Sequence, residues 1–255
     1  MVLDDSRLDL APTAEAGGDA RVAPISMRLL GIETATRRMS VALWQDGSIL
    51  AREGEFPDGG SGHVLPWIDE LLAEAGTTVA ALDGIAFGAG PGGFTGLRLA
   101  CGIAQGLAWG LQRPLLPVST LEALALASGR DRVWTCLDAR MNEIYSAVYL
   151  TGVESVTELS EPICVAPAVA PAPTLEDAWG VGDGFAAHGD LLRGRKPDLA
   201  GIDPRAFPTA TAVLRLAAPR FAGGLGESAE SACPIYVRDK VALTTAERLA
   251  RGGAK

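Results

Sequence analysis

The sequence predicts an α/β protein of two related domains, each built around a mixed central sheet. A strand that ends in an acid, a short polar turn and a returning strand occur at residues 28–44, and the same succession recurs about 105 residues later at 133–149. Helical periodicity appears between and after these hairpins. The chain has 255 residues, of which 48% are hydrophobic and 21% charged, enough to bury one large core or two modest ones. Chance similarity of two β-hairpins is the competing interpretation.

The patterned sequence begins at Met27. Residues 1–26 show no coherent period and carry Asp4 and Asp5 near their start, whereas a secretory signal needs a basic start and an apolar stretch. We therefore expect residues 1–26 to be a disordered N-terminal extension and Met27 to be the true or ancestral start.

The acids of the two hairpins occupy matching positions, because one buried strand runs to Glu33 and the other to Asp138. Duplicated units of this kind are typical of the actin, sugar kinase and Hsp70 class, in which both turns face one interdomain cleft and hold the phosphates and metal of a nucleotide. The class favours glycine or a small hydroxyl residue in these turns, so that the backbone can approach phosphate, but neither turn here contains glycine. We therefore expect the chain to keep the fold of this class but to lack a competent ATPase site. Candidate vestigial nucleotide contacts are Glu33, Thr34, Thr36 and Asp138.

A glycine-rich stretch at 88–96, GAGPGGFTG, follows a predicted strand at 82–87 and precedes a predicted helix from about Thr95 to Leu111. Its spacing satisfies G-x-G-x-x-G, but the next strand ends in Ser119 instead of the acid that a dinucleotide site requires. We interpret the stretch as a tight structural loop between strand and helix. Its structural glycines are Gly88, Gly90, Gly92, Gly93 and Gly96.

Two predicted helices of the first half carry an unusual surface. In the helix at 95–111 a glycine recurs at every fourth position, although each glycine costs about 1 kcal/mol in a helix interior. Small residues allow another backbone to approach closely, and the neighbouring helix at 61–75 has a wide apolar face. Either these helices pack against each other, or together they expose a seam to a partner chain. Candidate seam residues are His63, Leu65, Trp67, Leu71, Arg98, Gly102, Gln105, Gly106 and Trp109.

The remaining elements complete the two domains. They are, in order, a third strand at 48–56, a capped helix from Ser119 to about Ser128, a connector rich in proline and alanine at 165–173, a short strand and glycine turn at 179–184, a helix at 209–222 and a terminal strand at 234–238. Together the elements place a first domain at 27–128 and a second, smaller domain at 129–236, with a C-terminal segment, 237–255, that joins the first domain.

Charge, cysteine and histidine content exclude several classes of function. The net charge is −9, from 22 basic and 31 acidic residues, so we do not expect the protein to bind nucleic acid by itself. Four cysteines without a CxxC pair indicate buried, reduced thiols and a cytoplasmic protein. Two histidines without an HExxH or HxxxH pair leave no expected metal site. No apolar run approaches the roughly 18 residues of a membrane span.

One stretch is specific enough to indicate a family. The sequence GPGGFTGLR at 90–98, followed by AQGLA at 104–108, resembles the signature of the TsaB (YeaZ) family, historically called glycoprotease-like. Further family-like segments occur in the same order, namely IETAT at 32–36, PVSTL at 117–121, DARMNEIY at 138–145, GDG at 182–184 and PIYVR at 234–238. The resemblance covers nearly the whole chain from Met27. It departs from the family at Glu33, where Asp is more common, at Gly93, where Ser is common, and in residues 1–26.

The resemblance implies a duplicated actin-like ATPase (ASKHA, ribonuclease H-like) fold. It also implies a non-catalytic scaffold or activating subunit that pairs with a TsaD-like paralogue, which forms threonylcarbamoyladenosine (t6A) next to the anticodon of tRNAs. The contact would be made by the two helices of the first domain, which would form a homodimer when the protein is alone. A TsaE-like ATPase would be a further partner, and tRNA would be bound only through the complex. No cofactor, metal or catalytic residue is expected in this chain.

Two other functions compete with this interpretation. An ASKHA-type ATPase or kinase would need working phosphate loops, which turns without glycine do not provide. A peptidase, as the historical family label suggests, would need a nucleophile motif, and neither His63 nor His188 lies in one.

Overall fold

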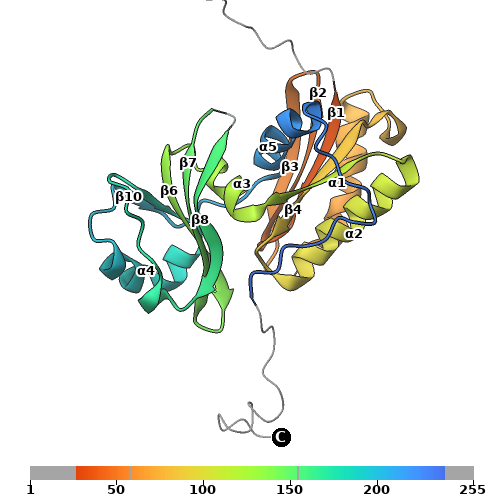
Figure 1. The fold of residues 1–255 in the computed structure, drawn as a ribbon. Coiled ribbons are helices and arrows are strands. Elements are labelled where there is room, and N and C mark those ends of the chain that lie inside the picture. Colours follow the sequence, from red (N-terminus) through yellow and green to blue (C-terminus); the bar gives the residue numbers. More distant parts are fainter. Residues whose placement is uncertain (1–26, 58, 154, 239–255) are drawn as a thin grey trace, which may run out of the picture.

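The computed structural model describes residues 27–57, 59–153 and 155–238. The expected N-terminal extension at 1–26 and most of the expected joining segment at 237–255 lie outside the described residues. Two sheets, each with helices packed against it, stand side by side (Figure 1).

The first domain contains a five-stranded sheet in the order β3-β2-β1-β4-β5. Its strands are β1 (Arg28–Glu33), β2 (Arg38–Gln45), β3 (Ser48–Glu55), β4 (Gly84–Gly90) and β5 (Leu115–Ser119). The first three strands pair antiparallel, whereas β4 and β5 run parallel to β1. Strand β4 is buried along its whole length because helices cover both faces of the sheet.

The second domain repeats this arrangement in the order β10-β9-β6-β7-β8. Its strands are β6 (Arg132–Arg140), β7 (Glu143–Thr151), β8 (Val156–Val165), β9 (Trp179–Val181) and β10 (Gly201–Asp203). Again three strands pair antiparallel and two add in parallel, with the first strand of the repeat at the centre. The predicted duplication is confirmed, because whole sheets and not just two hairpins share one topology.

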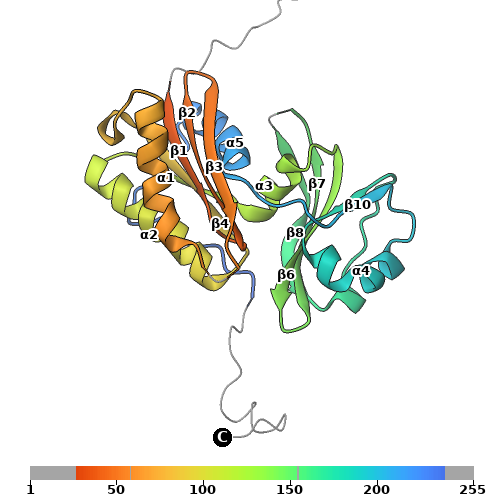
Figure 2. The ribbon, with the colours of Figure 1, turned by 180° about the vertical axis from the view of Figure 1, so that it is seen from behind.

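Helices cover the faces of both sheets (Figures 1 and 2). Helices α1 (Ser61–Glu74) and α2 (Phe94–Leu111) pack on one face of the first sheet, on the side away from the second domain. Helix α3 (Thr120–Ala127) lies between the sheets, and α4 (Gly184–Arg195) packs on the far face of the second sheet. The Ser119 side chain caps α3 by accepting from the Glu122 N–H, as the sequence pattern predicts.

Helix α5 (Ala210–Ala222) corrects the predicted domain boundary. Residues 129–236 were expected to form the second domain, but α5 packs on β1, β2 and β4 of the first. It buries Val213 and Leu214 against the face of the first sheet that α1 and α2 leave uncovered. The physical reason is that this face carries apolar side chains such as Leu29, which need a covering helix.

The segment after α5 also returns to the first domain. Residues 225–238 are here named the C-terminal strap. Near its start, Glu227 and Leu115 each donate a backbone N–H to the carbonyl of the other. The predicted strand at 234–238 is wrong, because these residues form no regular ladder; the Ile235 N–H donates to the Ala89 carbonyl at 2.7 Å. Figure 1 shows the strap in blue, running beside α2 toward the space between the domains.

The cysteines differ in exposure more than the sequence predicts. Cys101 and Cys136 are buried, as expected, but Cys164 is half-buried and Cys233 is exposed. Cys233 lies in the C-terminal strap, whose irregular backbone follows the surface and leaves most of its residues exposed.

Candidate functional site

The strand–acid–turn units of the two domains face a shared cleft of about 670 Å³. The cleft is lined by the first turn (34–37), the second turn (138–140), the glycine loop (91–97), the start of α1 (59–61), the start of α4 with Asp183, and the end of the C-terminal strap (235–238). Both halves of the duplication and three helix N-termini therefore contribute to one site.

Glu33 does not point into this cleft. Its side chain is 0% exposed, and its Oε1 accepts a hydrogen bond from the Ala35 N–H at 2.7 Å. Burial raises the pKa of Glu33 to about 7. Gly88 lies directly against the carboxylate, and a Cβ at Gly88 would overlap it. The acid of the first turn is thus held inside the first domain, and it occupies a backbone N–H of its own turn.

Thr34 and Thr36 are also engaged within the turn. The Thr34 side chain is buried, and its Oγ1 donates to the Gly96 carbonyl at 2.7 Å. The Thr36 Oγ1 donates to the Arg38 carbonyl at 2.9 Å and accepts from the Arg38 N–H at 3.2 Å. These contacts fix the backbone of the turn that faces the cleft.

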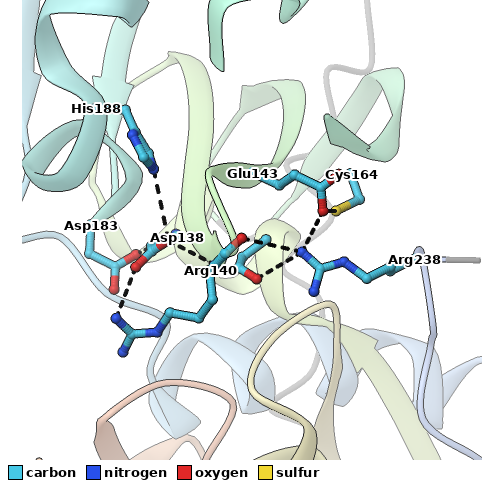
Figure 3. A network of polar contacts seen from close by, with 8 residues as sticks. Asp138, Arg140, Glu143, Cys164, Asp183, His188 and Arg238 are labelled. Atoms are coloured by element: carbon cyan, nitrogen blue, oxygen red, sulfur yellow. Dashed lines mark hydrogen bonds and ion pairs between the residues drawn. The ribbon is translucent and has the colours of Figure 1, made fainter. Parts of the chain in front are cut away.

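Asp138 repeats the contact that Glu33 makes. Its Oδ1 accepts from the Arg140 N–H at 2.8 Å, two residues further on, just as Glu33 accepts from Ala35. The Arg140 guanidinium lies 3.1 Å from Oδ2, and the Asp138 N–H donates to Asp183 Oδ1 at 2.9 Å (Figure 3). Burial raises the pKa of Asp183 above its usual range. His188 approaches Asp138 at 3.9 Å.

The glycine loop is explained by its packing on the first turn. Added Cβ atoms at Gly92 and Gly96 would collide with the backbone of Ala35 and Thr34, respectively. The Gly93 N–H donates to the Ala35 carbonyl at 2.7 Å. The loop therefore needs glycine so that two backbones can approach closely.

The glycine row of α2 faces outward. A Cβ at Gly102, Gly106 or Gly110 would meet no atom within 4 Å, whereas Ala100, Ala104 and Ala108 are buried on the sheet. The interpretation in which α1 and α2 pack against each other through the glycine row is therefore wrong. Trp109 is 63% exposed beside this row.

The predicted seam residues of α1 divide between surface and core. Leu65 is 53% exposed and Trp67 is half-buried. His63 is exposed and stacks on Phe56, with ring centroids 4.4 Å apart. Leu71 is 0% exposed and packs on the sheet with the other apolar residues of α1, so it is not available to a partner chain. The apolar periodicity of a helix shows which residues share a face, but it does not show which of them are buried against the sheet and which stay exposed.

Two predicted seam residues on α2 hold the C-terminal strap. The Gln105 Nε2 donates to the carbonyls of Ala229 at 3.0 Å and Ala232 at 2.8 Å. The Arg98 Nε donates to the Tyr236 hydroxyl at 3.2 Å. Both side chains therefore link the outer side of α2 to the strap.

The sequence patterns did not predict three polar residues that lie at the cleft or beside it. Arg238 and Glu143 form an ion pair at 2.6 Å beside the second turn, and Asp183 binds the backbone of Asp138 (Figure 3). They lie in the family-like segments PIYVR, DARMNEIY and GDG, which marked them as notable without indicating a role.

Comparisons with known proteins identify the family. A family model described as "TsaD: tRNA N6-adenosine threonylcarbamoyltransferase" matches residues 61–245. A relative from Escherichia coli (strain K12), named tRNA threonylcarbamoyladenosine biosynthesis protein TsaB, is 36% identical over 225 residues, which cover 85% of this chain and 96% of the relative. The chain belongs to the TsaB family. A TsaB from Haemophilus influenzae is 35% identical over 229 residues, covering 85% of this chain and 95% of the relative.

Solved structures agree with membership of the TsaB family. A structure described as YeaZ from Pseudomonas aeruginosa is 36% identical, covers 82% of this chain and 99% of its own, and superposes with a TM-score of 0.76. A second P. aeruginosa structure, described as similar to peptidase YEAZ, is 36% identical and covers 83% of this chain and all of its own, with a TM-score of 0.77. The resemblance and the two-domain ASKHA-like fold predicted from the sequence are confirmed.

Among residues 27–57, 59–153 and 155–238, no three His, Cys, Asp or Glu side chains gather in a way that could hold a metal ion. Within the same ranges no helix is both long and apolar enough to cross a membrane.

Proposed function

We propose that this protein is the non-catalytic scaffold or activating subunit of the machinery that forms threonylcarbamoyladenosine next to the anticodon of tRNAs. It acts by pairing with a TsaD-like catalytic subunit through the outer face of α2 and the adjoining exposed part of α1. The observation that carries this proposal is the uncovered glycine row of α2 in a chain of the TsaB family.

The outer face of α2 differs from the surface of an ordinary soluble helix. Its exposed residues include Gly102, Gly106, Trp109 and Gly110, and Arg98 is the one charged residue in the whole helix. A helix that faces water usually carries charged residues on that side. Glycine lowers its stability and exposed Trp109 adds apolar surface, so this face gains most when another helix packs closely on it.

The contacts of both turns support a non-catalytic role. A phosphate-binding turn presents free backbone N–H groups to the anion. Here the N–H of Ala35 is taken by Glu33, and the N–H of Arg140 is taken by Asp138. Each turn therefore commits to its own acid a backbone N–H that a bound phosphate would need as a donor.

The remaining expectations about partners belong to the same proposal. The net charge of −9 favours a protein that reaches tRNA through its complex and not by itself. A TsaE-like ATPase joins the complex, the protein forms a homodimer through the same helices when alone, and the assembly works in the cytoplasm, where tRNA is modified.

A variant of the glycine row tests the proposal. Gly106→Leu places a bulky side chain in open space, so the protein is expected to fold normally but to bind a TsaD-like subunit at least about tenfold more weakly. The matched control is Gly194→Leu, the same substitution at a helical glycine of the second domain that also faces open space. Co-purification, light scattering and tRNA modification with and without each variant provide the measurements.

Three results would contradict the proposal. Unfolding of Gly106→Leu would show that the row has a structural role, and equal losses in both variants would show that the surface is not specific. Saturable binding of ATP and Mg²⁺ by the isolated protein, measured by isothermal titration, would favour the alternative of an ASKHA-type ATPase or kinase.

A further inference from the structure

The C-terminal strap is attached to α2 at several points along its length. Gln105 binds two of its carbonyls, and Arg98 binds Tyr236. The ring of Tyr236 also lies 6.3 Å from that of Phe94, at the start of α2. These bonds come from the side of α2 that adjoins the glycine row, so the strap and the proposed partner surface share side chains.

The far end of the strap crosses the cleft. Arg238 follows the segment fixed to the first domain, yet its guanidinium binds the second (Figure 3). The Arg238 Nη2 donates to Glu143 Oε2 at 2.6 Å and to the Ala139 carbonyl at 2.9 Å. The Arg238 guanidinium also lies 5.9 Å from the ring of Tyr145. Among the residues that the structure describes, Arg238 is therefore the side chain of the strap that hydrogen-bonds to the second turn of the cleft.

The contacts of Arg238 are of a kind that contributes measurably. Its side chain is 14% exposed and that of Glu143 is 38% exposed, so the pair is partly shielded from water. Charge-assisted hydrogen bonds in such surroundings are stronger than exposed ion pairs. The backbone of the bound turn is itself unusual, because Arg140, Met141 and Asn142 all have φ near +60°. Arg238 thus holds the base of a hairpin tip that has an uncommon conformation.

We infer that the C-terminal strap couples the partner-facing side of α2 to the interdomain cleft, and that Arg238 is the latch that sets how far the cleft opens. A partner seated on the outer face of α2 would contact Gln105 and Arg98 and would thereby shift the strap. The shift reaches the second turn through Arg238. The partner-facing part of this inference rests on the proposed function, whereas the latch is a property of the isolated chain.

The latch is tested in the free protein by the distance between the domains. Spin labels are attached through p-acetylphenylalanine at Asp69 of α1 and Leu191 of α4, both of which are exposed. Arg238→Ala is expected to broaden the distance distribution and to raise amide exchange of the strap about tenfold, because the far end of the strap becomes free. Glu143→Gln removes the charge of the partner carboxylate in the second domain and should weaken the same ion pair. Arg52→Ala is the matched control, because its ion pairs with Glu70 and Glu74 lie within the first domain.

The coupling is tested from the other end of the strap. Gln105→Ala releases two strap carbonyls on α2 and is expected to broaden the same interdomain distribution, although Gln105 does not line the cleft. Gly102→Ala on the same helix touches nothing and is expected to have no such effect. Both single variants detach the same strap, one at α2 and one at the second turn. The double variant Gln105→Ala/Arg238→Ala should therefore broaden the distribution little more than the stronger of the two single variants.

The outcomes separate the strap from the proposed function. Unchanged distance distributions in both Arg238→Ala and Glu143→Gln would overturn the latch, and fully additive effects of Gln105→Ala and Arg238→Ala would overturn the coupling. If the wild-type chain fails to bind a TsaD-like protein, the proposed function fails while the measurements on the free chain still decide the latch. If it binds, Arg238→Ala should change the affinity for the TsaD-like protein severalfold, although Arg238 lies away from the outer face of α2.

Discussion

The Glu33 carboxylate lies directly against Gly88, in space that any larger residue on β4 would occupy. The same carboxylate accepts from the Ala35 N–H and from the Thr120 hydroxyl. One buried acid thus joins β4, the first turn and the start of α3. The glycine that begins the G-x-G-x-x-G pattern makes room for a carboxylate of the protein itself and not for a bound phosphate.

Gly88→Ala should therefore destabilise the protein. The added methyl group must displace a buried carboxylate and its hydrogen bonds, and overpacking of this kind costs about 1–3 kcal/mol. The measurement is the free energy of unfolding from denaturant titration. Gly102→Ala is the control: it lies in a helix and faces open space, so it should stabilise the protein by up to about 1 kcal/mol. Equal effects of the two substitutions would contradict this account of Gly88.

Glu33 should make the free energy of unfolding fall as pH rises from about 4.5 to about 7. Burial raises its pKa from 4.5 to about 7, so between these values the folded state binds more protons than the unfolded state. The contribution of the protonated acid is complete below pH 4.5 and is lost by about pH 7, and it amounts to at most about 3 kcal/mol. Glu33→Gln cannot ionise, and its free energy of unfolding should lack this component between pH 4.5 and 7. Parallel pH profiles for the two proteins would refute the assignment.

The position of α5 predicts which domain a core substitution will affect. Leu214 is buried between α5 and the first sheet, so Leu214→Ala should cost about 2–5 kcal/mol. Hydrogen exchange should rise in β1 and β4 before it rises in β6 and β9, since α5 covers the former pair. The opposite order would mean that α5 serves the second domain, as the sequence alone suggested.

The cysteines should react with thiol reagents in order of exposure. Cys233 is exposed, whereas burial raises the pKa of Cys136 well above its usual range and removes it from solvent. A maleimide should label Cys233 within minutes in the native protein and should reach Cys136 only on unfolding, as peptide mass spectrometry can show. Substituting Cys233→Ser should abolish the fast phase. A fast phase that persists in this variant would show that another thiol is accessible.

Local patterns in the sequence were sufficient for most of the secondary structure. The alternation of apolar residues and the capping box at Ser119 reflect interactions between near neighbours, and the elements predicted from them begin and end close to the observed positions. Strands β8 and β10 and helix α4 were not predicted, and the strand predicted at 234–238 is wrong. The strand that ends at Glu33 and the one that ends at Asp138 revealed the duplication, because both domains repeat the same local succession.

The sequence by itself determined the TsaB family signature, the two-domain α/β fold, and the glycine row on α2. Only the tertiary structure decided that the row faces outward, that Leu71 is buried, and that α5 covers the first sheet. The physical reason is that periodicity fixes which residues share a face but not which element covers it. The link from Arg238 to Glu143 spans 95 positions and depends on how the two domains are set against each other, which no local pattern encodes.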